Sequence, residues 1–148
     1  MSRAYQARFV DELLPGAWRA GHKSVLLALP VGAGKTKCSR LVTQRLLALS
    51  GWDIAVVDHR KGLTEQFSAE FAELAPGVFW AGKPSPVPSP LRIGGRDTLI
   101  RREWTPLCDK LLLVIDEAHH VAQQNTYGKL IQRFRTLYRV VYVLGLTA

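Results

Sequence analysis

Two short motifs hold the residues with the clearest potential for chemistry. The first, GAGKT at 32–36, follows an apolar run and combines two glycines with a lysine and a threonine. Gly32 and Gly34 let the backbone curl so that successive N–H groups point inward, an arrangement that binds anions. Lys35 can reach the β- and γ-phosphates of a nucleotide, and the Thr36 hydroxyl can complete a Mg²⁺ shell. This motif predicts a site for a nucleoside triphosphate with magnesium.

The second motif is DEAHH at 116–120, which directly follows the apolar run LLLVI. Ligands of an open parallel sheet bind beyond the carboxyl ends of its strands, so Asp116 and Glu117 are expected to face the phosphate loop. Asp116 can hold Mg²⁺ through water, and Glu117 can orient and deprotonate an attacking water. His119 and His120 belong to no H-E-x-x-H pattern and no cysteine cluster, which argues against structural zinc.

The elements that must position these motifs alternate along the chain. Short apolar runs rich in β-formers are separated by helical patterns, which predicts an α/β fold with a parallel sheet and crossover helices. The expected strands cover 24–29, 53–58, 111–116 and 140–146. The run at 24–29 is apolar on both faces, so it is expected to be a buried parallel strand.

Helical periodicity predicts the covering layers. The expected helices cover 5–13, 35–50, 63–74 and the segment around 127–134. Pro15-Gly16 is expected to end the first helix, and the second is expected to bury the stripe Leu41, Val42, Leu46 and Leu49. The prolines of 82–90 cannot donate to a sheet, so this segment is predicted to be a loop or stiff linker.

Bulk composition limits the class of protein. A length of 148 residues with 47% hydrophobic content fits one globular domain with a proper core. No apolar run approaches the about 20 residues needed to cross a bilayer, and the N-terminus lacks a signal-peptide pattern. Cys38 and Cys108 show no metal spacing and are expected to be reduced thiols, so we expect a cytoplasmic protein. The net charge of +8 indicates a polyanionic partner, most often nucleic acid.

Taken together, the motifs resemble those of a known family. LPVGAGKT, then VIDEAHH, then LGLTA resemble motifs I, II and III of superfamily 2 helicases, DEAH-box in the broad sense, and more narrowly the restriction-enzyme and phage-type DNA helicases. The resemblance spans nearly the whole chain and implies that 1–148 is an N-terminal RecA-like lobe, a P-loop NTPase fold with a mostly parallel sheet flanked by helices. It implies ATP and Mg²⁺ as ligands, with Gln6 of RAYQ as the adenine reader. The phosphate loop it implies contains Pro30, Gly32, Ala33, Gly34, Lys35, Thr36 and Lys37.

Two further segments are similar to the family's DNA-contacting motifs. VVDHRKGLTEQF resembles motif Ia, and IGGRDTLIRR resembles the segment around motif Ib, although Asp58, Gly62 and 95–97 depart from the usual residues. Basic residues at these positions can hold a nucleic-acid backbone without reading bases. The resemblance favours DNA over RNA and leaves the choice between them open, and the residues expected to hold the nucleic acid are Arg60, Lys61, Thr98, Arg101 and Arg102. It also implies that His119 and Thr147 couple this surface to the nucleotide site.

The resemblance implies a second RecA-like lobe as partner. In the family, LGLTA runs on to that lobe, which supplies an arginine finger worth about 10³–10⁵ in rate. We therefore expect little ATP turnover from this chain alone, and we favour a lobe of a longer helicase over a stand-alone lobe that pairs in trans. A restriction-type motor without strand separation and a catalytically weak nucleic-acid-binding remnant stay open as alternatives. A small-molecule P-loop kinase has no need of D-E-A-H. Arg133, Arg135 and Arg139 are expected to be surface charges, and Trp80 and Trp104 core residues.

Overall fold

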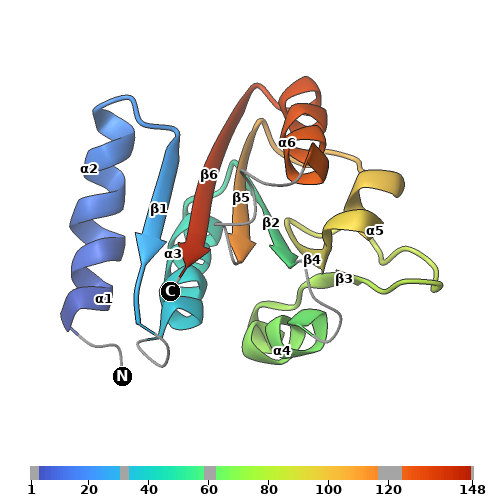
Figure 1. The fold of residues 1–148 in the computed structure, drawn as a ribbon, viewed down its shortest axis with the longest axis horizontal. Coiled ribbons are helices and arrows are strands. Elements are labelled where there is room, and N and C mark those ends of the chain that lie inside the picture. The colour runs from blue at the N-terminus through green and yellow to red at the C-terminus, as the bar shows by residue number, and fades with distance from the viewer. Residues whose placement is uncertain (1–3, 31–33, 59–62, 117–124, 148) are drawn as a thin grey trace.

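Parallel strands form a six-stranded sheet in the part of the chain that is described, with the order β1-β6-β5-β2-β4-β3 (Figure 1). The computed structural model describes residues 4–30, 34–58, 63–116 and 125–147. The strands are β1 (Ser24–Ala28), β2 (Trp52–Asp58), β3 (Gly77–Phe79), β4 (Leu91–Gly95), β5 (Lys110–Asp116) and β6 (Val140–Thr147). Each neighbouring pair of strands is parallel.

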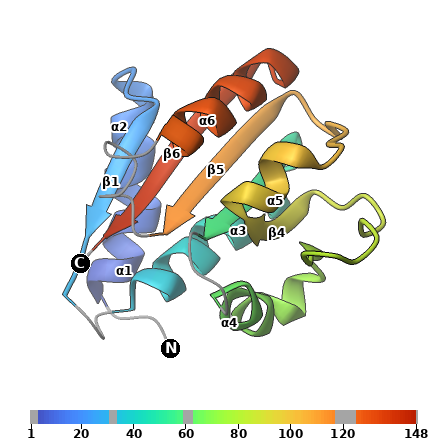
Figure 2. The same cartoon turned by 45° about the vertical axis from the view of Figure 1, so that its right-hand side comes forward.

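Helices cover the two faces of this sheet (Figures 1 and 2). The face that we call the α3 face is covered by α1 (Ala4–Arg8), the π-helical segment η1 (Phe9–Leu13), α2 (Leu14–Arg19), α3 (Lys35–Leu49) and α4 (Leu63–Glu70). A 3₁₀ turn, η2 (Ala72–Leu74), follows α4. The opposite face, which we call the α6 face, is covered by α5 (Arg96–Arg101) and α6 (Asn125–Leu137). The predicted α/β class with helices on both sides of a parallel sheet is confirmed.

The central strands explain why the fold is stable. All seven residues of β2 are buried, and β5 is buried from Leu111 to Asp116. A strand covered on both faces needs apolar side chains at successive positions rather than alternating ones, which is why DIAVVD and LLLVI read as continuous runs. Helix α6 contributes Tyr127, Leu130 and Phe134 to the core on its face, all of them fully buried.

The first helical region is longer than predicted. Pro15-Gly16 does not end it, because α2 begins at Leu14 and continues through both residues to Arg19. A proline lacks the N–H of a regular helix, and its ring meets the carbonyl four residues earlier. Here the π-helical segment η1 precedes it, with the Leu14 N–H bonded to the Phe9 carbonyl, and this wider turn makes room for the ring.

Two predictions of burial are wrong. The run at 24–29 was expected to be covered on both faces, but β1 is an edge strand, and Leu26 keeps 61% of its surface exposed. In α3, Val42 and Leu46 are buried as expected, whereas Leu49 lies in the last turn beyond the sheet and is 68% exposed. Both exceptions lie at the boundary of the fold, where one covering layer ends.

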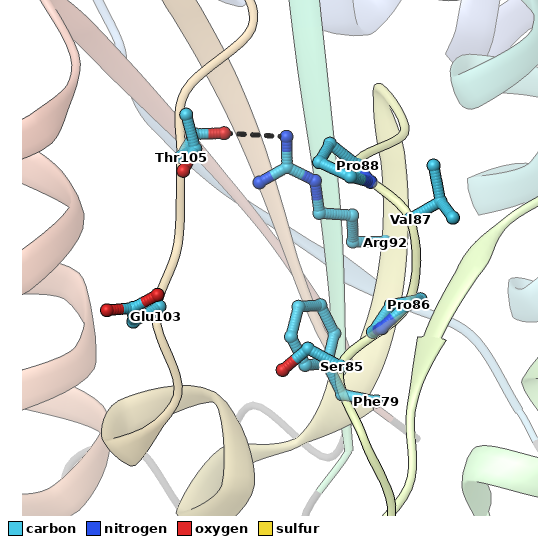
Figure 3. Close-up of a pocket in the computed structure, with 8 residues that line it drawn as sticks. All are labelled: Phe79, Ser85, Pro86, Val87, Pro88, Arg92, Glu103 and Thr105. Carbon is cyan, nitrogen blue, oxygen red and sulfur yellow. Dashed lines mark hydrogen bonds between the residues drawn. The ribbon is translucent and has the colours of Figure 1, made fainter.

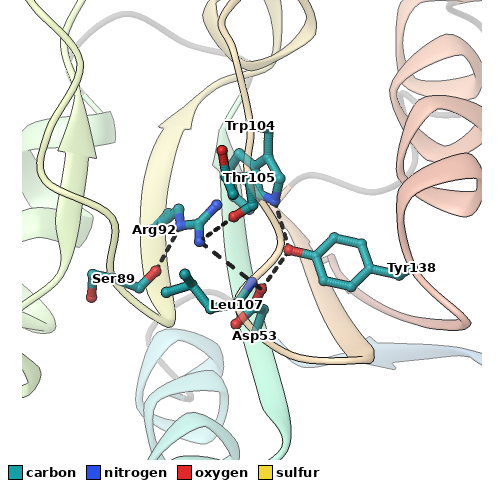
Figure 4. A network of polar contacts seen from close by, with 7 residues as sticks. All are labelled: Asp53, Ser89, Arg92, Trp104, Thr105, Leu107 and Tyr138. Atoms are coloured by element: carbon teal, nitrogen blue, oxygen red, sulfur yellow. Dashed lines mark hydrogen bonds and ion pairs between the residues drawn. The ribbon is translucent and has the colours of Figure 1, made fainter.

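A buried polar network fastens the amino-terminal edge of the sheet (Figure 4). Asp53, which is fully buried, accepts hydrogen bonds from the Tyr138 hydroxyl at 2.6 Å and the Leu107 N–H at 2.9 Å. Arg92 is paired with Asp53 at 4.0 Å, donates to the Thr105 carbonyl at 2.8 Å, and stacks on the ring of Trp104. Trp104 is a core residue, as predicted. The charges of this network can be buried because they are paired and hydrogen-bonded.

Arg133 is also better anchored than predicted. Its guanidinium donates to the backbone carbonyls of Leu99 and Arg102, so it ties α6 to the end of α5 instead of lying free on the surface. No described helix combines the length and the apolar character needed to cross a membrane.

Candidate functional site

The carboxyl-terminal edge of the sheet brings the two chemical motifs together. Because β1 and β5 run in the same direction, the loop after β1 and the last residue of β5 lie at the same edge. Helix α3 begins at Lys35, directly after that loop, and β5 ends at Asp116. We call this edge the nucleotide edge.

Gly34 shapes the start of α3. Its φ of 86° lies in the left-handed region that glycine tolerates, and its carbonyl accepts the first hydrogen bond of the helix, from the Cys38 N–H at 3.0 Å. A Cβ added at Gly34 would lie 2.3 Å from Nε2 of Gln6. The backbone conformation therefore disfavours any other residue here, and an added side chain would also displace the Gln6 amide.

Gln6 packs against the same glycine. It is 2% exposed, and its Nε2 donates to the Gly34 carbonyl at 3.4 Å. Helix α1 is thereby held against the entrance of α3. The position lies next to the phosphate loop, and the predicted reading of adenine by Gln6 stays a prediction.

Lys35 and Asp116 form an ion pair at the nucleotide edge. Lys35 Nζ lies 3.6 Å from Asp116 Oδ1, and the side chains are 21% and 7% exposed. Oδ1 of Asp116 is buried and accepts no hydrogen bond from the residues that the structure describes. An anionic oxygen in that condition suits a cation or an ordered water, so the donor set fits the hydrated Mg²⁺ that the sequence predicts.

The other predicted residues that the structure describes lie at the same edge of the sheet. Thr36 is half-buried in the first turn of α3, and Lys37 is exposed. Thr147 is 8% exposed at the end of β6, where its carbonyl accepts the Leu29 N–H at 3.0 Å, just before the exposed Pro30. The predicted residues Gly32, Ala33, Glu117 and His119 lie outside the described residues.

Of the residues predicted to bind nucleic acid, some are exposed and one is already hydrogen-bonded within the protein. Arg101 is exposed at the end of α5, and Thr98 lies one turn earlier with its carbonyl accepting the Arg102 N–H at 3.1 Å. The guanidinium of Arg102 donates to the carbonyls of Trp80 at 2.8 Å and Lys83 at 2.6 Å and to Ser85 at 3.0 Å. Arg102 therefore fastens the proline-rich loop. The predicted Arg60 and Lys61 lie outside the described residues.

Asp58 is a second buried carboxylate at the nucleotide edge, and the motifs did not assign it a role. It ends β2, is 2% exposed, and accepts a hydrogen bond from the Thr64 hydroxyl at 2.6 Å. Val57 is paired with Ile115, so Asp58 and Asp116 are the next positions on neighbouring strands. Burial raises the pKa of Asp58, Thr64 opposes this, and the charge of Asp116 raises it further. The sequence did contain a signal for Asp58, because a carboxylate directly follows an apolar run there.

A separate cavity lies away from the nucleotide edge (Figure 3). It has a volume of about 190 Å³ and lies between β3, the proline-rich loop and the segment after α5. Arg92, which is 2% exposed, lines it together with the exposed Glu103, but the guanidinium of Arg92 is engaged with Ser89 and Thr105. The predicted nucleotide-site residues do not line this cavity.

Residues 1–88 match the family described as "Type III restriction enzyme, res subunit". Solved structures with a similar fold include the Hef helicase domain of Pyrococcus furiosus (TM-score 0.75, 19% identity), covering 99% of this chain and 32% of that one. A second is the Sulfolobus solfataricus SWI2/SNF2 ATPase core in complex with dsDNA (TM-score 0.72, 18% identity), where the match covers 98% of this chain and 31% of that one. A third is the UvsW helicase from bacteriophage T4 (TM-score 0.70, 17% identity), where the match covers 98% of this chain and 51% of that one. The chain thus spans about a third to a half of these proteins, and at such identities the likeness establishes the fold.

Proposed function

Because the chain belongs to the family of the type III restriction enzyme res subunit, whose domain is the N-terminal lobe of superfamily 2 helicases, we propose that it binds ATP with Mg²⁺. In this proposal residues 1–148 form the first RecA-like lobe of a motor that acts on nucleic acid. The observation that carries it is the 3.6 Å ion pair between Lys35 and Asp116. A phosphate-binding ammonium and a magnesium-binding carboxylate must lie near each other to serve one bound nucleotide.

Each residue of the nucleotide edge has a defined task in the proposal. The α3 amino terminus and Lys35 hold the β- and γ-phosphates, because N–H groups, helix dipole and ammonium all favour negative charge there. Thr36 and Asp116 would hold Mg²⁺, with Asp116 acting through water, and the ion would supply positive charge against the phosphates. Glu117 orients and deprotonates the attacking water, and Gln6 recognises adenine. His119 and Thr147 couple the site to nucleic acid.

Nucleic acid and a second lobe are the proposed partners. Arg60, Lys61, Thr98, Arg101 and Arg102 are proposed to contact the backbone of DNA in preference to RNA, although the engaged guanidinium of Arg102 leaves Arg101 the stronger candidate on α5. A second RecA-like lobe, in cis or in trans, would supply the arginine needed for fast hydrolysis. The family description makes a translocating motor without strand separation the second candidate function.

A nucleotide titration tests the proposal. A fluorescent ATP analogue is titrated with Mg²⁺ into the wild-type chain, Lys35→Ala and Lys129→Ala. Lys129 is an exposed lysine of α6 and serves as the charge-matched control. Lys35→Ala is expected to weaken nucleotide binding at least about tenfold, since a buried charge-assisted contact to phosphate contributes about 1.5–3 kcal/mol. Salt-sensitive binding of single-stranded DNA should survive in both variants. Equal nucleotide affinity of all three proteins would refute the assignment of the site.

A further inference from the structure

Trp80 differs from the other tryptophans in its surroundings. Trp18 stacks on Trp52 with ring centroids 5.4 Å apart. Trp104 stacks on Phe79 at 5.8 Å within the core of the α6 face. Trp80 is half-buried and belongs to neither core, so the core position predicted for it is wrong. Its indole contacts no ring and no cation in the part of the chain that the structure describes.

The local backbone turns the Trp80 ring away from the core. β3 is the edge strand at the far end of the sheet from β1, and it ends at Phe79 (Figure 1). Phe79 is buried in the core of the α6 face, and because side chains of an extended chain alternate, the next residue points away from that core. Trp18 Nε1 is buried without an acceptor, whereas Trp80 Nε1 is not buried and donates to no group that the structure describes. The edge of the Trp80 indole therefore faces water.

The backbone of Trp80 is fixed to the end of α5. Its carbonyl accepts a hydrogen bond from the Arg102 guanidinium at 2.8 Å and another from the Lys83 N–H at 3.2 Å. The same guanidinium donates to the Lys83 carbonyl at 2.6 Å, so one side chain holds both ends of the turn at 80–83. A ring on a backbone that is already held loses little conformational entropy when a ligand stacks on it.

Exposed positive charge lies near this tryptophan. Lys83 is exposed in the turn, and Arg101 is exposed at the end of α5. Neither cation has an acidic partner in the described part of the chain. Of the nearby acids, Asp97 is paired with Arg96 at 3.5 Å, which leaves the exposed Glu103 as the opposing charge. Unpaired cations therefore outnumber unpaired acids here, which favours a polyanionic ligand.

A water-facing aromatic ring beside exposed cations suits a single strand of nucleic acid. Cations follow the phosphates of such a strand while aromatic rings stack on its bases, whatever the sequence. A duplex cannot use the ring in this way, because its bases are stacked inside the helix. We propose that Trp80 stacks on an unpaired base of single-stranded nucleic acid, with Arg101 and Lys83 beside the flanking phosphates. This inference rests on the proposed function and narrows its substrate to a strand with unpaired bases.

Binding of short oligonucleotides tests this inference on the whole chain. The probes are a labelled oligothymidylate of about 12 nucleotides, a duplex of the same length, and a strand of equal length with abasic sites in place of its bases. Trp80→Ala is expected to weaken binding of the oligothymidylate about tenfold, the effect of losing one base–aromatic stack. The duplex and the abasic strand should bind wild type and Trp80→Ala alike. Trp80→Phe keeps an aromatic ring and should keep most of the affinity.

Intrinsic fluorescence gives a second measurement that needs no alanine variant. Saturating oligothymidylate should quench the tryptophan fluorescence of the wild-type chain, because a base lies on the Trp80 ring. The quenching should be much smaller in Trp80→Phe, since Trp18, Trp52 and Trp104 are packed against other rings of the protein.

Three results would overturn the inference and leave the proposed function in place. The first is equal affinity of wild type and Trp80→Ala for the oligothymidylate, and the second is an equal loss for all three probes. The third is saturating binding by wild type without quenching. A wild-type chain that binds none of the probes at low salt would refute the nucleic-acid part of the proposed function as well. Circular dichroism of Trp80→Ala and its affinity for the fluorescent ATP analogue are expected to be unchanged.

Discussion

Asp58 and Asp116 end two neighbouring strands, so two carboxylates lie side by side at the nucleotide edge. They are held differently: Asp116 faces the ammonium of Lys35, whereas Asp58 receives only the hydroxyl of Thr64 among the described contacts. Strands in a sheet are about 4.8 Å apart, and at that spacing like charges repel when both are buried. The unequal partners make Asp116, which is ion-paired with Lys35, the stronger candidate than Asp58 for a magnesium ligand.

Replacing Asp58 by asparagine should change the pH dependence of stability. Burial first, and Asp116 in addition, raise the pKa of the folded state above the ordinary value of 3.8. The native state therefore binds more protons than the unfolded state between the two pKa values, and the free energy of unfolding falls as the pH rises through this window. Asp58→Asn should remove this fall and be more stable than wild type at pH 7, measured by urea unfolding across pH. Asp109→Asn, at an exposed carboxylate, should keep the slope.

The Tyr138 hydroxyl is the central link of the network at the opposite edge. It donates to Asp53 and accepts the Trp104 Nε1–H, both at 2.6 Å, and Asp53 Oδ1 already accepts no hydrogen bond. Tyr138→Phe leaves a fully buried carboxylate with one partner fewer, so the free energy of unfolding should fall by about 1–3 kcal/mol. Tyr142→Phe is the control, since that ring packs on Trp18 and Trp52. Similar losses in both variants would contradict the role of the hydroxyl.

At the scale of elements, hydrophobic periodicity located the central strands and the long helices. β2, α3, β5 and α6 lie where apolar spacing placed them, because each buries a continuous face. β3 and β4 could not be found this way. β3 has three residues, and β4 contains Arg92, a charge that is buried only because Asp53 and Trp104 lie beside it. Those partners are distant in sequence, and no local pattern contains them.

The same limit applies to the candidate site. The spacing of GAGKT and DEAHH predicted that Lys35 and Asp116 belong to one site, since strand direction alone brings them to one edge. The exposure of β1 and the engagement of Arg102 depend on which neighbours the strand order and the proline-rich loop provide. The role of Arg102 in binding nucleic acid stays a prediction, and its contacts with Trp80 and Lys83 give a physical basis for a test.

Alanine substitutions at two glycines should separate the effect of core packing on stability from the effect of helix propensity. A Cβ at Gly94 in β4 would lie 2.9 Å from Leu99 Cδ2 and 3.1 Å from Phe79 Cβ, whereas one at Gly128 in α6 meets nothing within 4 Å. Gly94→Ala should therefore destabilise the protein by about 1–3 kcal/mol through overpacking of β4 against α5. Gly128→Ala should stabilise it by about 0.5–1 kcal/mol. Denaturant unfolding of both variants measures this, and a loss in Gly128→Ala would contradict the open environment.

At the scale of the whole molecule, the two edges of the sheet hold different kinds of polar groups. The nucleotide edge holds Lys35, Asp116 and Asp58, and the amino-terminal edge holds the polar network that fixes the strands. Nucleotide binding is proposed for the edge where the buried Asp116 faces Lys35, and the amino-terminal edge is fastened by the hydrogen bonds of Asp53, Arg92 and Tyr138.

The net charge of +8 predicts that the binding of nucleic acid depends on salt concentration. If Arg101 contacts a phosphate, binding of single-stranded DNA should weaken linearly on a log–log plot against salt, and Arg101→Ala should reduce the slope by about 0.7. Arg19→Ala removes the same charge from an exposed position on α2, which covers the other face, and should leave the slope unchanged. Fluorescence anisotropy with a labelled oligonucleotide measures both. An equal reduction in the two variants would mean that binding follows total charge and that α5 is not the contact surface.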